Sequence, residues 1–209
     1  MVVIQIDGMN KDVDDGSALI HIVGGHLADI VQKGQNLRLG QRDLLVFLNS
    51  ELSFQFLFFC LLFMHFDYVC CAEGSGGTHA GVALGAMLYM PQTKTVGLMV
   101  DSDPFEVITT NIMQETANLL DLDFTPTAEN VHLIDMCGPD YAIPSPEGNA
   151  AIRMMAENEG LFLDPVYTGK AFAGLVKMAR EGQFKPTDNV LYLYSGGAGG
   201  LFAIDIELD

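Results

Sequence analysis

The sequence predicts an α/β fold in which helices cover both faces of an open, doubly wound and mostly parallel sheet. From residue 67 onward, short apolar segments alternate with segments of helical pattern, an alternation that is typical of such a sheet. The short segments are apolar throughout, as expected for parallel strands covered on both sides. Glycine-rich turns follow several of them, where open α/β sheets bind ligands. We therefore predict an atypical N-terminal segment, 1–66, and an α/β domain, 67–209.

The predicted elements of the α/β domain follow one another with short connections. Strands are expected at 67–72, 95–100, 131–135, 161–164 and 189–194, and helices at 78–90, 105–120, 145–159 and 169–184. Residues 102–104 predict a helix start with a capping side chain and a proline in the first turn, and residues 145–147 give the same signal for the next helix. Gly160 is expected to end that helix.

The first 43 residues contain weaker signals. Residues 2–7 are compatible with a short strand, and residues 18–32 with a strand and a helix that two glycines interrupt. The aspartates within 12–15 resemble part of a calcium loop but lack the glycine and the distal glutamate that such a loop needs. We therefore expect a solvated turn there and no metal site.

Residues 44–66 differ from the rest of the chain because they hold seven of its 13 phenylalanines. Residues 52–66 are almost wholly apolar, but a membrane-spanning helix needs about 20 apolar residues, and residues 49–51 interrupt the run. No basic cluster flanks it to set an orientation. A membrane span is the least favoured interpretation; the others are a buried segment and translated non-coding sequence in a gene model. Peptide mass spectrometry that finds this segment in the natural protein would contradict the last.

The chain has 10 basic and 27 acidic residues, which gives a formal net charge of −17. Such a surface repels nucleic acid and anionic lipid, so we expect neither as a partner and interpret the charge as a solubility feature. The cysteines form no C-x-x-C pair and are expected to be reduced and buried, as in an intracellular protein; they are Cys60, Cys70, Cys71 and Cys137. No signal peptide is recognised, and we expect a cytoplasmic location, with an organelle as the alternative.

The turn at 74–78 follows a predicted strand and precedes a predicted helix. Phosphate groups bind at such turns because glycines let backbone N–H groups approach and a helix N-terminus supplies partial positive charge. Ser75 and Thr78 can add hydroxyl donors. The turn lacks the further residues of a dinucleotide fingerprint or a Walker loop. We predict phosphate binding here; the alternative is a tight turn without a ligand. His79 is interpreted as an ordinary residue of the helical turn.

Two further turns lie at the ends of predicted strands. Residues 163–170 place Tyr167 and Thr168 between a strand and a helix, either as site residues or as a capping turn with Thr168 as N-cap and Tyr167 in the core. Residues 194–200 form a glycine-rich turn after the last strand. Because the carboxyl ends of parallel strands share one edge of a sheet, we expect the three turns to converge on one site.

The motifs GSGGTHAG at 74–81, LDPVYTGKAFAGL at 163–175 and YSGGAGGLFA at 194–203 occur in an order that resembles the fold-type-II, tryptophan-synthase-β-like enzymes, which use pyridoxal phosphate (PLP). The similarity is greatest to the branch of D-cysteine desulfhydrase and aminocyclopropane-carboxylate deaminase, and it covers 67–209. The resemblance implies PLP as cofactor and a small amino acid as substrate. It also implies that the cofactor phosphate is held by Ser75, Gly76, Gly77 and Thr78.

The resemblance assigns further roles in the site. Tyr167 is expected to line the cofactor and the substrate, and Tyr141 corresponds to a second family tyrosine, although an alanine follows it where the family has glycine. Thr168 is expected to face the pyridine nitrogen, where the deaminases have glutamate and the desulfhydrases threonine. This favours a desulfhydrase, with a weaker electron sink. Ser195 and Gly196 lie where the family has His-Thr-Gly-Gly, so the third turn is kept in part.

The Schiff-base lysine through which PLP enzymes hold their cofactor is not recognised. The family carries it in an N-terminal Asn-Lys dipeptide followed by basic residues. Of the six lysines here, Lys11 follows an asparagine, but acidic residues come next. The sequence therefore predicts a truncated fold-type-II enzyme.

Three functions remain open for such a chain. The first is a PLP-dependent lyase, which converts D-cysteine to sulfide, ammonia and pyruvate or acts as the deaminase. The second is a non-catalytic remnant of the PLP site, and the third is a membrane-tethered interaction protein. A truncated fold would expose sheet edge and apolar surface, which predicts a homo-oligomer.

Overall fold

The structure is a computed structural model that describes residues 2–6, 20–22 and 65–206. It contains a six-stranded sheet with the strand order β2-β1-β6-β3-β4-β5. The strands are β1 (Val2–Ile6), β2 (Ile20–Ile22), β3 (Tyr68–Glu73), β4 (Lys94–Met99), β5 (Leu133–Asp135) and β6 (Val190–Tyr194). The α-helices are α4 (Gly77–Tyr89), α5 (Phe105–Leu119), α6 (Pro146–Glu159) and α7 (Thr168–Arg180).

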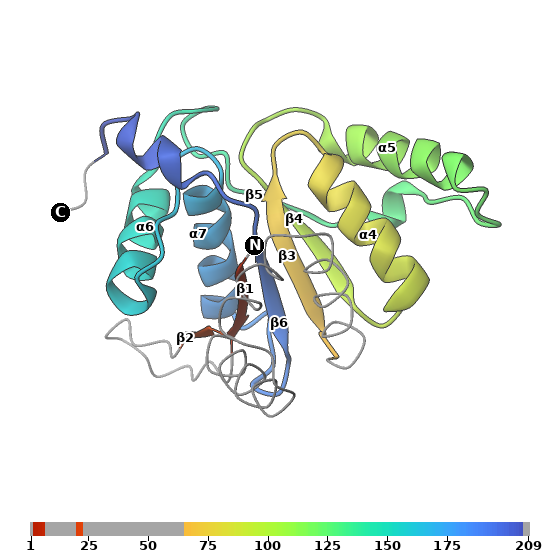
Figure 1. The fold of residues 1–209 in the computed structure, drawn as a ribbon, viewed down its shortest axis with the longest axis horizontal. Helices are drawn as coiled ribbons and strands as arrows, with labels where there is room; N and C mark the ends of the chain where they lie inside the picture. Colours follow the sequence, from red (N-terminus) through yellow and green to blue (C-terminus); the bar gives the residue numbers. More distant parts are fainter. Residues whose placement is uncertain (1, 7–19, 23–64, 207–209) are drawn as a thin grey trace, which may run out of the picture.

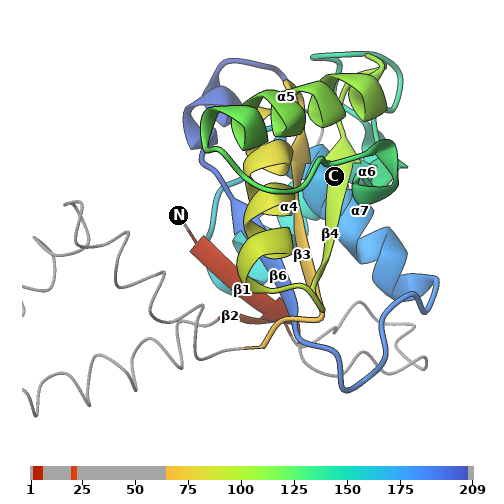
Figure 2. The same ribbon diagram turned by 90° about the vertical axis from the view of Figure 1, so that its right-hand side faces the viewer.

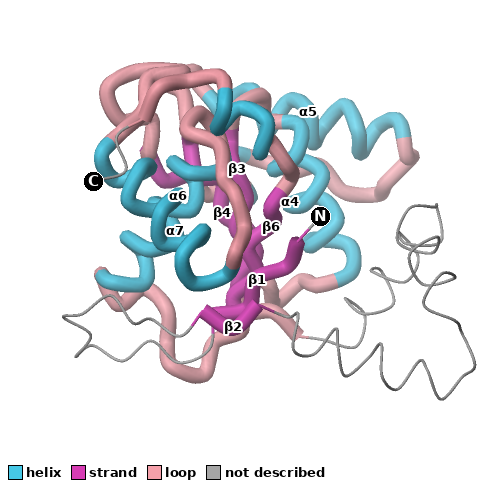
Figure 3. Tube along the Cα trace, turned by 60° about the vertical axis from the view of Figure 1, so that its left-hand side comes forward, coloured by secondary structure: helices cyan, strands magenta, loops and turns pink. Residues whose placement is uncertain are grey.

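Four neighbouring strands, β6, β3, β4 and β5, run parallel, and β1 pairs antiparallel with both β6 and β2. Helices α4 and α5 lie on one side of the sheet and α6 and α7 on the other (Figures 1 and 2). Figure 3 shows the strands as a layer between the helices. The predicted doubly wound, mostly parallel α/β fold is therefore confirmed.

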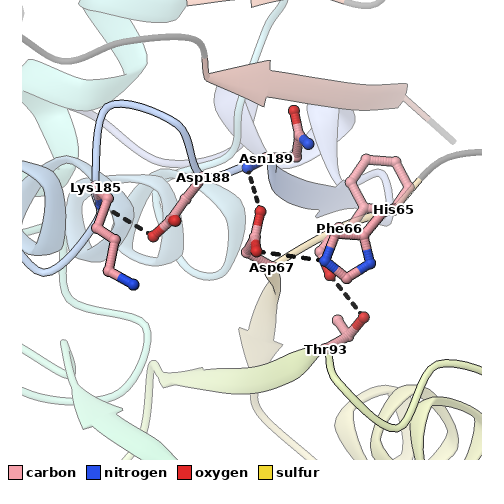
Figure 4. Close-up of polar contacts among 7 residues, drawn as sticks. All are labelled: His65, Phe66, Asp67, Thr93, Lys185, Asp188 and Asn189. Atoms are coloured by element: carbon pink, nitrogen blue, oxygen red, sulfur yellow. Dashed lines mark hydrogen bonds and ion pairs between the residues drawn. The ribbon is translucent and has the colours of Figure 1, made fainter.

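The register of the parallel strands brings their carboxyl ends to one edge of the sheet. At the opposite, amino end, β3 begins beside the first residues of β4 and β6. Figure 4 shows the contacts that hold these starts together. Thr93 Oγ1 donates a hydrogen bond to Phe66 O at 2.6 Å, and Asn189 N donates to the Asp67 carboxylate at 2.8 Å. The loops that follow the strands are therefore presented together at the other end.

The structure differs from the prediction at 161–164, which forms no strand. Its polar backbone groups bond to side chains and to the backbone of the first turn of α7 instead. The Tyr194 hydroxyl donates to Phe162 O at 2.9 Å, and Asp164 N donates to Thr168 Oγ1 at 2.9 Å. The strand prediction was wrong because an apolar run does not reveal that side chains outside it, those of Thr168 and Tyr194, bond to its backbone.

The two predicted helix starts have different outcomes. Helix α6 follows Ser145, whose Oγ accepts a hydrogen bond from Gly148 N at 3.0 Å, and it ends at Gly160 with φ of 65°, as predicted. Helix α5 follows Pro104, and no side chain caps it. The capping prediction at 102–104 was wrong because proline occupies the cap position itself and offers no side-chain acceptor.

Only part of the N-terminal segment lies within the described residues, so its predictions can be compared with the structure only there. The predicted strand at the N-terminus is present as β1, and β2 lies within the predicted strand-and-helix segment at 18–32. The aspartates within 12–15, the remainder of that segment and residues 44–64 lie outside the described residues. No helix within the described residues is long and apolar enough to cross a membrane.

The larger hydrophobic core lies between the sheet and helices α6 and α7. Leu98, Leu175, Phe172 and Tyr192 are fully buried in it, and the two aromatic rings meet edge to face with their centroids 5.5 Å apart. Cys70 lies in the same core, and burial raises the pKa of its thiol to about 12. The described cysteines are all buried, as predicted.

Candidate functional site

The glycine loop, residues 74–78, connects the carboxyl end of β3 to the N-terminus of α4. Gly76 is the N-cap residue and has φ of 82°, a left-handed conformation that glycine adopts without strain. A Cβ atom at Gly76 would also lie 3.0 Å from two isoleucine side chains of α5. The first N–H groups of a helix have no acceptor within it, and Ser75 and Thr78 are exposed beside them. The loop can therefore receive a phosphate group.

Two buried titratable residues bracket the glycine loop. Glu73 ends β3, His79 lies in the first turn of α4, and both side chains are 0% exposed. Glu73 Oε2 lies 2.6 Å from His79 Nδ1, although the two atoms do not meet hydrogen-bond geometry. Glu73 Oε1 accepts a hydrogen bond from Thr109 Oγ1 of α5 at 2.8 Å. The cluster therefore ties the two ends of the loop to each other and to α5.

Asp164 caps helix α7 from a buried turn. Its carboxylate accepts hydrogen bonds from the backbone N–H groups of Val166 at 2.9 Å, Tyr167 at 2.7 Å and Thr168 at 2.9 Å. The Thr168 hydroxyl donates to the same carboxylate at 2.6 Å. Both Asp164 and Thr168 are buried, so the hydroxyl proton of Thr168 is committed to Asp164. The N-cap position belongs to Tyr167, not to Thr168.

The two tyrosines singled out from the sequence meet at the glycine loop. The hydroxyls of Tyr141 and Tyr167 are hydrogen-bonded, and their ring centroids lie 6.1 Å apart. A Cβ atom at Gly74 would lie 3.1 Å from Cε1 of Tyr167, so this ring packs directly on the loop backbone. Tyr167 is 39% exposed and therefore lies at the surface, not in the core. The hydrogen bond with Tyr141 and partial burial raise the pKa of Tyr167 to about 12.

The third loop, residues 194–200, meets the second loop, residues 163–170, at Asp164. Gly197 has φ of 96°, and a Cβ atom there would lie 2.5 Å from the Asp164 carboxylate. Ser195 is exposed and Gly196 has φ of 113°. The hydroxyl of Tyr192 in β6 donates to the carbonyl oxygen of Thr168 at 3.0 Å. Contacts therefore join the first loop to the second and the second to the third.

Lys170 lies on α7, three residues after Tyr167, and its side chain is fully buried. Its Nζ donates hydrogen bonds to the carbonyl oxygens of Cys137 at 2.5 Å and Asp140 at 2.8 Å. Burial lowers the pKa of Lys170, and the nearby Cys137, Asp140 and Asp101 oppose this shift. The amine is therefore engaged by the loop that carries Tyr141.

The fold and these loops together define an α/β domain in which the glycine loop lies beside two hydrogen-bonded tyrosines. A family model described as pyridoxal-phosphate dependent enzyme matches residues 61–196. The chain belongs to this family of PLP-dependent enzymes, as the sequence motifs predicted. It is also similar to a solved structure described as that of an ACC deaminase homologue, with 34% identity and a TM-score of 0.60. The match covers 66% of this chain and 42% of that one, so the chain spans less than half of the length of that protein.

The residues present fit one end of PLP. The glycine at the left-handed N-cap and the exposed hydroxyls at 75 and 78 suit its phosphate. When bound, PLP supplies an electron sink for the substrate. A Schiff-base amine is not found among the described lysines: Lys170 is engaged as above, and the others lie at the start of β4, in the last turn of α7 and before β6, namely Lys94, Lys177 and Lys185. Lys11 and Lys33 lie outside the described residues.

Three contributors to the site were missed from the sequence. Asp164 could have been found, because an Asp-Pro dipeptide before a helix is a turn and capping signal. Glu73 could have been flagged as a carboxylate that ends an apolar strand, since such groups are buried only with partners. Lys170 gave no local signal, because its acceptors lie 33 and 30 residues away in the chain.

Proposed function

We propose that this chain provides the phosphate-binding and tyrosine-bearing part of a PLP-dependent lyase for small amino acids, most like D-cysteine desulfhydrase. The observation that carries the proposal is the packing of Tyr167 on the glycine loop while its hydroxyl bonds to Tyr141. This arrangement supports a cofactor phosphate held by the loop and a substrate beside the tyrosines. We propose a part of the site and not all of it because no Schiff-base lysine is recognised within the described part of the chain.

Each residue group has a definite task under this proposal. Ser75, Gly76, Gly77 and Thr78 bind the phosphate through N–H and hydroxyl donors. Tyr167 and Tyr141 orient the substrate and hold a proton between their hydroxyl oxygens. Because the pKa of Tyr167 is raised to about 12, this tyrosine is protonated at neutral pH. We therefore assign the pair a role as hydrogen-bond donor or acid, not as a base.

Thr168 supports desulfhydrase over deaminase. In the family, the deaminases have glutamate at this position and the desulfhydrases threonine, and a neutral hydroxyl cannot keep a ring nitrogen protonated. Here the hydroxyl proton is already donated to Asp164. The alternative, a deaminase of aminocyclopropane-carboxylate, is supported by the 34% identity to the ACC deaminase homologue. A non-catalytic PLP-binding role is supported by the finding that none of the described lysines is recognised as a Schiff-base residue.

The test is binding of PLP to the purified chain, measured by equilibrium dialysis. We expect Gly76→Val to weaken binding about tenfold or more, because a β-branched side chain is strained at positive φ and would contact α5. Gly81→Ala is the matched control on the same helix, since nothing lies within 4 Å of its Cβ position, and it should bind as the wild type does. Absence of PLP binding by the wild type would overturn the proposal.

Turnover then separates the candidate functions. Borohydride reduction and peptide mapping would reveal a lysine linkage, and sulfide release from D-cysteine would support the desulfhydrase. Ammonia release from aminocyclopropane-carboxylate without sulfide release would favour the deaminase. Binding without a linkage and without either product would identify a non-catalytic PLP-binding protein.

We also propose that the chain self-associates. Several large apolar side chains are more than half exposed, among them Leu119 at 85%, Phe202 at 83% and Val107 at 58%. Exposed apolar surface of this kind favours association. Light scattering is expected to find a species larger than one chain, and a monodisperse monomer would contradict this expectation.

A further inference from the structure

The loop that carries Tyr141, residues 136–145, connects β5 to α6 without regular structure of its own. It turns twice through positive φ, at Gly138 with 72° and at Ala142 with 58°. A non-glycine residue such as Ala142 adopts this conformation only when its surroundings impose it. The position of Tyr141 therefore depends on contacts that fix the loop.

Local contacts account for part of this constraint. Cys137 N donates to the Asp135 carboxylate at 3.0 Å, and Tyr141 N donates to the carboxylate of Asp140 at 2.8 Å. These bonds join neighbours in the sequence, so they shape the loop but do not attach it to α7. The attachment comes from Lys170, whose Nζ bonds the carbonyl oxygens of Cys137 and Asp140.

Helix geometry links this attachment to Tyr167. Residues three apart on a helix lie on the same face, so the first turn of α7 presents Tyr167 and Lys170 together. Tyr167 meets the hydroxyl of Tyr141, and Lys170 holds the backbone immediately before it. We propose that Lys170 is a positioning residue that fixes the loop at 136–145 so that Tyr141 bonds to Tyr167. Its relevance to catalysis rests on the function proposed above, but the contact itself does not.

The chemistry of the amine agrees with this assignment. A fully buried amine must be hydrogen-bonded, and backbone carbonyls are acceptors that no substitution of a neighbouring side chain removes. A methionine at 170 would fill a similar volume but donate no hydrogen bond. Lys170→Met would remove the donor of Cys137 O, leave Asp140 O with only the longer bond from Ile143 N at 3.3 Å, and free the loop from α7.

The state of the tyrosine pair can be measured without any cofactor by nitration with tetranitromethane, mapped by peptide mass spectrometry. The reagent attacks the ionised phenol, so the rate of nitration of a tyrosine follows its ionised fraction. When the bond between Tyr167 and Tyr141 is lost, the pKa of Tyr167 falls from about 12 toward its ordinary value of 10.0. At a fixed pH below both values, the ionised fraction then rises. In Lys170→Met we expect Tyr167 to react about tenfold faster, as expected for a fall of one pKa unit. Tyr141→Phe, which removes the bond directly, should give a similar increase.

Lys177→Met is the matched control, because Lys177 is an exposed lysine on the same helix. In this variant Tyr167 should be nitrated at the wild-type rate. Hydrogen exchange should rise in Lys170→Met over 136–145 and not across the sheet. Unchanged nitration of Tyr167 in a folded Lys170→Met variant would overturn the inference, and so would an equal increase at the core residue Tyr192. If Lys170→Met does not fold, Lys170→Gln serves instead. Its single amide should give an intermediate rate, and a wild-type rate would overturn the inference.

PLP binding is scored separately on the same proteins. A nitration contrast in a chain that binds no PLP would support the positioning role and contradict the proposed function. PLP binding by a chain that shows no nitration contrast would support the proposed function and contradict the positioning role.

Discussion

Replacing Asp164 by alanine is expected to lower the free energy of unfolding by about 3–4 kcal/mol, since each buried N–H group left without an acceptor costs about 1–3 kcal/mol. The substitution removes the acceptor of three backbone N–H groups and of the Thr168 hydroxyl. Asp164 is only 2% exposed, so water cannot replace the carboxylate without rearrangement. Urea unfolding followed by circular dichroism measures the effect.

Two further variants make this result specific. Asp164→Asn keeps one carbonyl oxygen and is expected to lose about half as much, because part of the cap can re-form. Asp103→Ala removes an exposed aspartate near the start of α5 and should change stability by less than about 0.5 kcal/mol. If Asp164→Ala and Asp103→Ala were equally mild, the buried cap would not be the contact that holds the start of α7.

The consequences of Asp164→Ala should extend to the site. Asp164 lies beneath Gly197 of the third loop and holds Tyr167 and Thr168 of the second. A variant that remains folded should therefore bind PLP more weakly than the wild type, while the glycine loop itself is unchanged. This links the stability of α7 to the convergence of the loops.

The predictable part of the fold was set by local pattern. Ser145 and Gly160 mark the ends of α6 because a hydroxyl acceptor and a left-handed glycine act within a few residues. The segment 161–164 has the composition of a strand, but its backbone bonds to the side chains of Thr168 and of Tyr194, which lies 32 residues from Phe162. Periodicity carries no information about such contacts.

The site divides in the same way. The positions of the first and third loops follow from the rule that ligands bind at the carboxyl ends of parallel strands, whereas the second loop follows a segment that forms no strand. The packing of Tyr167 on the glycine loop depends on α7 and on Asp164, which caps this helix. For Tyr167 and Thr168 the sequence left two interpretations open, and the structure contradicts the one with Thr168 as N-cap and Tyr167 in the core. Tyr167 is partly exposed at the N-cap, whereas Thr168 is buried against Asp164.

The buried Glu73–His79 pair should have the second large effect on stability. His79→Ala leaves the buried Glu73 carboxylate with Thr109 as its remaining partner, and we expect a loss of about 2–3 kcal/mol, the usual cost of leaving a buried polar group without a partner. Glu73→Ala should cost a similar amount. The double variant Glu73→Gln/His79→Gln removes both groups and can re-form a neutral hydrogen bond, so it should lie closer to the wild type than either single variant.

The chain offers a natural control at its surface. His65 lies 3.4 Å from Asp67, and its side chain is 63% exposed, so His65→Ala should change stability by less than about 0.5 kcal/mol (Figure 4). Equal effects of His65→Ala and His79→Ala would show that burial does not strengthen the pair at the loop. Because the glycine loop lies between Glu73 and His79 in the chain, breaking the buried pair should also weaken phosphate binding. Inorganic phosphate tests this directly: a folded His79→Ala variant with wild-type affinity would separate the pair from the loop, whereas a weaker affinity would assign it to the binding site.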